Sequence, residues 1–156
     1  MYRRIVVPLD GSSLAEAVLP HATAIAESFK AELHLVQVVR EARDLVNLGV
    51  LDPVSMGSVA VPDMETLASA VQAQAQHTER YLEEQAAAPR SKGIKVVTAV
   101  LLGDPSTQIV KYAQDKGMDL VAISTHGRSG ISRMVFGSVA ERVVRQGTVP
   151  VLLIRP

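Results

Sequence analysis

The sequence predicts an α/β fold, an open and doubly wound sheet of five parallel strands with about four helices. Five short runs rich in Val, Ile and Leu alternate with helical patterns along the chain. Runs nearly apolar on both faces are typical of parallel strands covered by helices. Regular strand–helix alternation favours one open sheet with right-handed crossovers. The predicted strands are Arg4–Leu9, Glu32–Val39, Lys95–Leu101, Leu120–Ser124 and Pro150–Ile154.

The first predicted helix lies between the first two strands. Its apolar side chains recur at steps of three and four, which marks one buried face of a helix. Ser13 and Glu16 have the spacing of a capping box at its start. The predicted buried stripe consists of Leu14, Val18, Ala22, Ile25 and Phe29.

The second predicted helix runs roughly from Asp63 to Ala87, and Pro89 and Gly93 are expected to end it. A long link, about Arg40–Pro62, precedes it. A link of this length in a compact domain is usually a lid, a contact surface or a disordered segment. The residues expected on the inner face of the helix are Leu67, Val71, Thr78 and Leu82.

The last two predicted helices have clear start and stop signals. Asp104 is the expected N-cap of the third, followed by Pro105 at its first position, and Gly117 ends it. The fourth follows Gly137 and ends at Gly147. The predicted inward residues are Ile109, Val110 and Ala113 in the third helix and Val139, Val143 and Val144 in the fourth.

Composition narrows the class of protein. The 156 residues fit one domain, spanning 1–156. The absence of Cys excludes disulfides and thiolate zinc sites, and the four His lack metal-ligand spacing. Lys plus Arg equals Asp plus Glu at 16 each, and aromatic residues make up only 3%, so we expect no nucleic-acid partner.

The chain shows no membrane signal. No apolar run approaches the ~20 residues that a membrane-spanning helix needs. The first residues lack the apolar core and cleavage site of a secretory signal and lead directly into a strand. We therefore expect no membrane association and a cytoplasmic location.

The first candidate site is the end of the first strand, at Pro8, Leu9 and Asp10. In doubly wound sheets, ligands bind beyond the carboxyl ends of the strands. An acid there is well placed to accept hydrogen bonds from a sugar or a base. Alternatively, Asp10 and the two Ser residues that follow only form the turn and cap the helix.

The second candidate site is the small-residue segment after the fourth strand. Glycine N–H groups there could turn toward a phosphate, and Gly137 opens a helix whose amino end favours anions. A capping box between Ser138 and Glu141 would instead satisfy those N–H groups internally. The candidate residues are Ser124, Thr125, Gly127, Arg128 and Gly130, followed by Gly137, Ser138 and Val139.

These segments resemble the universal stress protein family. Its ATP-binding members carry Gly-x-x-Gly, nine residues, then Gly-[Ser/Thr]. Here Gly127 matches the second Gly, Gly137 and Ser138 match the final pair, and Ser124 replaces the first Gly. The similarity covers the whole chain and includes Pro8-x-Asp10, Gly103-x-Pro105 and the closing Val-Pro-Val-Leu-Leu-Ile.

The resemblance implies a Rossmann-like domain of the adenine nucleotide alpha hydrolase type that binds ATP, with Mg²⁺ as a further candidate. By resemblance, Asp10 meets the ribose and the main chain near Pro8 and Val38 brackets the adenine. Serine is small, so we expect Ser124 to be compatible with binding. The residues implied around the phosphates are Gly127, Arg128, Gly137, Ser138 and Val139. The resemblance also implies a homodimer through the C-terminal strand, Val149–Ile154.

The sequence favours a regulatory role over catalysis. It lacks the P-loop and nucleophile-elbow motifs, and no general base is evident beside a γ-phosphate. The first hypothesis is therefore a stress-response regulator that binds ATP and hydrolyses it slowly at most. The alternative is a dimeric interaction module that has lost nucleotide binding and contacts an unknown protein partner through Arg40–Pro62. An enzyme acting on a nucleotide is a third possibility.

Overall fold

The structure, a computed structural model, contains the predicted five-stranded parallel sheet. It describes residues 1–40, 64–125 and 137–155. The strand order is β3-β2-β1-β4-β5, so β3 and β5 form the edges. Two strands begin one residue later than predicted. The strands are β1 (Arg4–Leu9), β2 (Glu32–Val39), β3 (Val96–Leu102), β4 (Leu120–Ser124) and β5 (Val151–Ile154).

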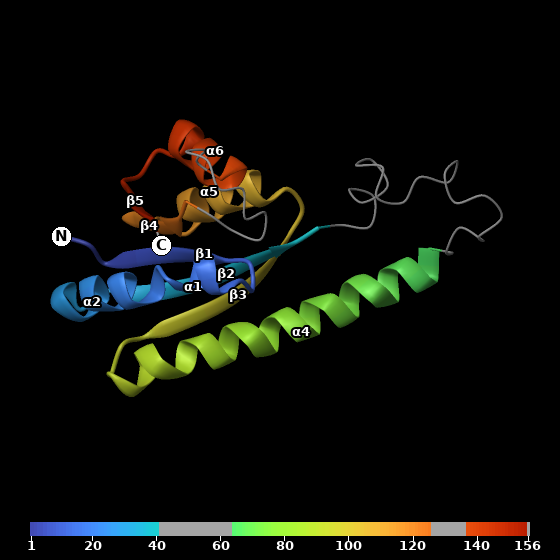
Figure 1. Ribbon diagram of the computed structural model, residues 1–156, viewed down its shortest axis with the longest axis horizontal. Helices are drawn as coiled ribbons and strands as arrows, with labels where there is room; N and C mark the ends of the chain where they lie inside the picture. The colour runs from blue at the N-terminus through green and yellow to red at the C-terminus, as the bar shows by residue number, and fades with distance from the viewer. Residues whose placement is uncertain (41–63, 126–136, 156) are drawn as a thin grey trace.

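Helices cover both faces of the sheet, as Figure 1 shows. Helices α1 (Ser13–Glu16), α2 (Leu19–Phe29) and α4 (Met64–Ser91) lie on one face. Helices α5 (Pro105–Asp115) and α6 (Ser138–Gln146) lie on the other. The chain therefore changes direction across the sheet between β1 and β4, which is where a doubly wound fold opens a crevice for ligands.

Alternate residues of the central strand point into two separate cores. Ile5 and Val7 pack with α1, α2 and α4, whereas Val6 packs with α5 and α6. All three side chains are fully buried. Each such burial contributes roughly 1.5–3 kcal/mol to the free energy of folding, so β1 is held firmly from both sides.

The first helical region differs from the prediction because it is split in two. Pro20 has no N–H to donate within a helix, and it occupies the first turn of α2, where none is needed. The predicted capping box from Ser13 is wrong. Ser12 is the N-cap, and its Oγ accepts a hydrogen bond from the Ala15 N–H at 3.1 Å. Phe29 is exposed rather than buried, and its ring packs edge-on against Tyr2.

Helix α4 continues through Pro89 to Ser91, so Pro89 does not end it as predicted. The Arg90 guanidinium donates to Glu83 and to the Val96 carbonyl, and Thr98 Oγ1 donates to Glu83 at 2.6 Å. These contacts hold the last turns against the edge strand β3 despite the lost hydrogen bond. Gly93, with φ +78°, then turns the chain into β3.

Helix α5 begins as predicted, with Asp104 as N-cap and Pro105 at the first position. The Asp104 carboxylate accepts hydrogen bonds from the side chains of Ser106 and Thr107 and from the Thr107 N–H. Its Oδ2 lies 3.7 Å from Arg142 on α6. These contacts lower the pKa of Asp104 to about 2, with the Ser106 hydrogen bond as the main cause.

Replacing Asp104 by Asn should make stability less dependent on acid pH. A lowered pKa in the folded state means that the ionised carboxylate stabilises the fold above the unfolded pKa of about 3.9, and that this gain is lost as pH falls through about 2. Because the side chain is half-exposed, we expect wild type to exceed Asp104→Asn by only about 1 kcal/mol at pH 6. Urea unfolding should show this difference disappearing by pH 2. A difference independent of pH would contradict the assignment.

Candidate functional site

A cavity of about 340 Å³ opens at the carboxyl ends of the strands, beside the switch point between the neighbouring strands β1 and β4. Residues from β1, β2, β4 and the start of α6 line it. The predicted site residues that line it are Pro8, Leu9, Asp10, Val38, Ser124, Thr125, Gly137, Ser138 and Val139. The remaining predicted residues, Gly127, Arg128 and Gly130, lie outside the described residues. The structure thus brings both candidate segments to one cavity.

Five further residues line the cavity and were not predicted as site residues: Ala15, Arg40, Pro105, Ile123 and Ala140. Pro105 carried a signal, because it belongs to the Gly103-x-Pro105 element. Arg40 carried a weaker one, since it lies two residues after Val38 and alternate residues of a strand face the same side. Asp10 and Arg40 are the only charged side chains among the described lining residues.

Asp10 shapes the turn after β1. Its Oδ1 accepts hydrogen bonds from the Ser12 N–H at 3.0 Å and from the Ser12 hydroxyl at 2.6 Å. Gly11 between them has φ +81°, a conformation that favours glycine. The turn-forming alternative is therefore correct for Asp10. It leaves a role toward a ligand open, because a carboxylate accepts up to about four hydrogen bonds.

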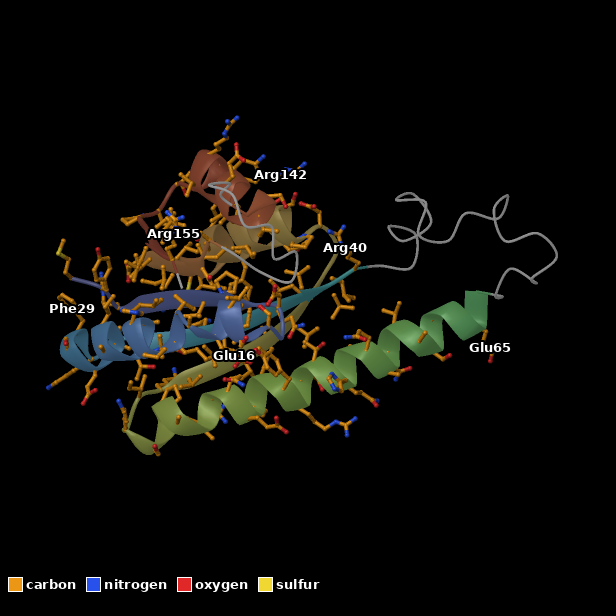
Figure 2. All side chains as sticks on the ribbon, in the orientation of Figure 1. Glu16, Phe29, Arg40, Glu65, Arg142 and Arg155 are labelled. Carbon is orange, nitrogen blue, oxygen red and sulfur yellow. The ribbon has the colours of Figure 1, made fainter. Side chains whose placement is uncertain are left out.

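A tyrosine on α4 contacts the segment that follows this turn. The Tyr81 hydroxyl donates to Glu16 Oε1 at 2.9 Å, and Gln85 also reaches Glu16. Glu16 is the last residue of α1 and lies on the side of that helix that faces α4 in Figure 2. Burial, followed by the hydrogen bond to Glu16, raises the pKa of Tyr81, whose hydroxyl also meets the Gly11 backbone. Helix α4 is thus hydrogen-bonded to the turn that carries Asp10.

Tyr81→Phe should loosen this turn. Losing the hydroxyl should lower the free energy of unfolding by about 1 kcal/mol. If the cavity binds a ligand through Asp10, ligand affinity should also fall severalfold, because the turn is less well ordered. Urea unfolding and titration calorimetry measure the two effects. Tyr2→Phe is the matched control, since Tyr2 packs on Phe29 away from the cavity. Equal affinity in wild type and Tyr81→Phe would contradict the positioning role.

Gly137 brings the start of α6 against the end of β4. Its N–H donates to the Thr125 carbonyl at 2.6 Å, and a Cβ at this position would lie 2.7 Å from that oxygen. Gly137 is also the N-cap of α6, with no side-chain capping bond. The capping box that would start at Ser138 is therefore wrong, because Ser138 is already the first helical residue. The amino end of α6 faces the cavity through Ser138 and Val139.

Ser124 is the last residue of β4 and is buried along with Thr125. It pairs with Ile154 of β5, and the Thr125 N–H donates to the Ile154 carbonyl at 2.9 Å. Because both residues also line the cavity, β5 fixes the wall that Ser124 contributes. Because the side chain of Ser124 is small, the cavity reaches close to the backbone of β4 at this position.

A larger groove, of about 850 Å³, lies at the opposite ends of the strands. It is highly charged, with Arg3, Lys30 and Lys95 among its lining residues. Lys30 forms the C-cap of α2, where a cation offsets the negative end of the helix dipole. Helix carboxyl ends repel anions and parallel strands bind ligands at their other ends. We therefore assign the functional site to the smaller cavity.

Two further findings concern the described residues as a group. They contain no cluster of three or more His, Cys, Asp or Glu side chains that could hold a metal ion. None of their helices is both long enough and apolar enough to cross a bilayer.

The family profile described as "Universal stress protein family" matches residues 1–155. The chain belongs to this family. Universal stress protein MJ0531 of Methanocaldococcus jannaschii is 31% identical over 155 residues, covering 99% of this chain and 83% of the relative. Universal stress protein YxiE of Bacillus subtilis is 31% identical over 157 residues, covering 99% of this chain and 100% of the relative. The resemblance noted in the sequence is thereby confirmed.

Solved structures of universal stress proteins share the fold. The structure of protein MJ0577 of M. jannaschii aligns with a TM-score of 0.80 at 26% identity, over 100% of this chain and 97% of that chain. UspA from Lactobacillus plantarum aligns with a TM-score of 0.79 at 24% identity, over 99% and 98% of the two chains. The Rossmann-like architecture of this universal stress protein is therefore shared by its structural neighbours.

Proposed function

We propose that this universal stress protein binds an adenine nucleotide, ATP in particular, in the cavity beside β1 and β4. The observation that carries the proposal is the convergence of three chemically distinct groups on one cavity. The amino end of α6 suits phosphate, the Asp10 carboxylate suits ribose hydroxyls, and Val38 provides an apolar surface for a base. Together these groups match the parts of a nucleotide in order.

The order of the strands determines which way the nucleotide would lie in the cavity. Ser124 and α6 lie on the β4 side of β1, and Val38 lies on the β2 side. Two strand spacings amount to roughly 10 Å, and a nucleotide is long enough to reach across them with its phosphates at one end and its base at the other. A nucleotide with its phosphates at α6 would then cross Asp10 at the ribose and end over β2 at the base.

The close approach at Gly137 supports phosphate binding. A side chain there would meet the Thr125 carbonyl, so glycine is what lets the start of α6 lie against the end of β4 at the cavity that both line. Phosphates are favoured at such a position because backbone N–H groups and the positive end of the helix dipole both point toward it.

Related proteins support adenine as the base. One universal stress protein has been crystallised in complex with cAMP, and the Archaeoglobus fulgidus protein in complex with dAMP. Because these two proteins are only 19% and 20% identical to this chain, their similarity to it is a similarity of fold. The ligands of both proteins contain adenine, and the proposal extends that class of ligand to this cavity.

A regulatory role fits this site better than rapid catalysis. Asp10 is the only carboxylate among the described lining residues, and it already forms a turn. Mg²⁺ would accompany ATP through the nucleotide phosphates and water, because Mg²⁺ keeps several waters and binds substrate phosphates readily. The bound ion would neutralise phosphate charge. With Asp10 engaged by the turn and the ribose, the described lining residues offer no general base, so we propose a cytoplasmic stress-response regulator with slow hydrolysis at most.

We further propose a homodimer formed through Val149–Ile154. Strand β5 is an edge of the sheet, and its residues Val151–Ile154 are all only partly buried. An apolar edge strand exposes unpaired backbone groups and needs cover. A second copy paired strand to strand would provide that cover. Because Ile154 pairs with Ser124, the dimer edge is one strand away from the cavity.

Mass spectrometry of the small molecules that heat releases from freshly purified protein, together with ATP titration calorimetry, tests the binding proposal. We expect about one adenine nucleotide per chain, either carried through purification or bound on titration. Protein that arrives empty and gives no binding heat would contradict it. That result would favour the interaction-module alternative, whose expected surface lies outside the described residues except for Arg40.

A further inference from the structure

We propose that Arg40 contacts the base of the bound nucleotide and makes the site accept guanine as well as adenine nucleotides. The proposal rests on the nucleotide-binding function proposed above and adds to it a residue that determines base specificity. Neither the sequence motifs nor the family resemblance pointed to Arg40.

Arg40 lies at the base end of the cavity. It follows β2 directly, where Figure 2 shows it at the end of the strand, and it lines the cavity together with Val38. Strand β2 is separated from β4 by β1, so Arg40 and the start of α6 lie on opposite sides of Asp10. A nucleotide bound with its phosphates at α6 would therefore present its base, and not its phosphates, to Arg40.

The Arg40 guanidinium has no ion-pair partner within the described parts of the chain. Two arginines of α6 differ in this respect. Arg142 lies 3.7 Å from Asp104, and Arg145 lies 3.0 Å from Glu141. Arg40 is exposed. Contacting a ligand would therefore not require Arg40 to break an ion pair with another described residue.

The chemistry of the side chain determines which base edge it prefers. A guanidinium group only donates hydrogen bonds, and it presents two donors side by side. Guanine offers two matching acceptors, O6 and N7, whereas the same edge of adenine offers the N7 acceptor beside the N6 amino donor. Arg40 should therefore strengthen the binding of guanine nucleotides more than that of adenine nucleotides. As a result, the affinities of the site for ATP and GTP should be closer to each other.

Replacing Arg40 by Gln tests this preference. Glutamine both donates and accepts, which suits the N6/N7 edge of adenine. We expect Arg40→Gln to raise the ratio of ATP affinity to GTP affinity about fivefold, the lower end for one bidentate pair because the residue is exposed. Arg80→Ala is the control, since Arg80 is an exposed arginine on α4 that does not line the cavity. It should leave the ratio unchanged.

A phosphate series separates a base contact from a phosphate contact. Arg40→Ala should weaken AMP, ADP and ATP by the same factor in titration calorimetry, because all three share one base. A loss that grows with each phosphate and shrinks with added salt would show that Arg40 binds phosphate and would overturn the proposal. An unchanged ATP-to-GTP ratio in Arg40→Gln would also overturn it. Wild type that binds no nucleotide would instead overturn the proposed function itself.

Discussion

Gly137→Val is expected to abolish nucleotide binding and to lower the free energy of unfolding by about 2–3 kcal/mol. The added Cβ would lie 2.7 Å from the Thr125 carbonyl oxygen, a backbone atom that cannot rotate away. Either α6 or the end of β4 must move. Since both the start of α6 and Thr125 line the cavity, the phosphate end of the site changes shape in either case. ATP titration calorimetry and urea unfolding measure the two losses.

Gly93→Ala is the matched control for a glycine substitution. A Cβ at Gly93 would meet no atom within 4 Å, but the residue has φ +78°, which disfavours alanine. We expect a loss of about 1 kcal/mol in stability with unchanged ATP affinity, because Gly93 lies at the other end of the strands. If Gly137→Val bound ATP as wild type does, the phosphates could not lie at the start of α6.

Asp10→Ala is expected to weaken ATP binding about thirtyfold, the effect of losing hydrogen bonds to a charged acceptor. Asp10→Asn distinguishes the effect of the negative charge on ATP binding from the effect of the turn that Asp10 forms. Its amide oxygen can still accept from Ser12, as the carboxylate does at 3.0 Å and 2.6 Å. We therefore expect Asp10→Asn to fold with near wild-type stability and to lose only about fivefold in affinity. Titration calorimetry with ATP provides the comparison.

Deoxynucleotides test whether Asp10 acts through the ribose. In wild type, 2′-deoxy-ATP or 3′-deoxy-ATP should bind more weakly than ATP, according to which hydroxyl Asp10 accepts from. In Asp10→Ala this penalty should disappear, because the partner of the missing hydroxyl is also gone. A penalty of equal size in both proteins would contradict a ribose contact and leave Asp10 with its turn alone.

Sequence reasoning predicted the fold well where a local signal decides the structure. The apolar runs placed the strands, and Asp104 followed by Pro105 placed the start of α5. It failed where tertiary contacts override a local signal. Pro89 stays within α4, and the last turns of this helix contact β3: Arg90 donates to the Val96 carbonyl, and Thr98 donates to Glu83 of α4. The split between α1 and α2 had a local signal in Pro20, which the stripe of apolar residues concealed.

The candidate site shows the same division. Motif spacing identified Asp10 and Gly137, and the structure places both at one cavity. Tyr81 could not be found from spacing, because its partner Glu16 is 65 residues away and the contact exists only after folding. Arg40 lies in no motif; it follows Val38 by two residues, and only the order of the strands places both at the end of the cavity opposite α6. Whether Ser124 affects binding depends on contacts with a ligand, which the chain alone does not specify.

A titration of ¹⁵N-labelled protein with ATP and Mg²⁺, followed through backbone amide signals, tests most directly where the nucleotide binds. The account predicts the largest shifts at Gly11, Ser124, Thr125 and the start of α6 from Gly137. It predicts small shifts around Lys30 and Lys95, in the charged groove at the opposite ends of the strands. Shifts concentrated in that groove, with the Gly11 and Gly137 signals unmoved, would contradict the central claim.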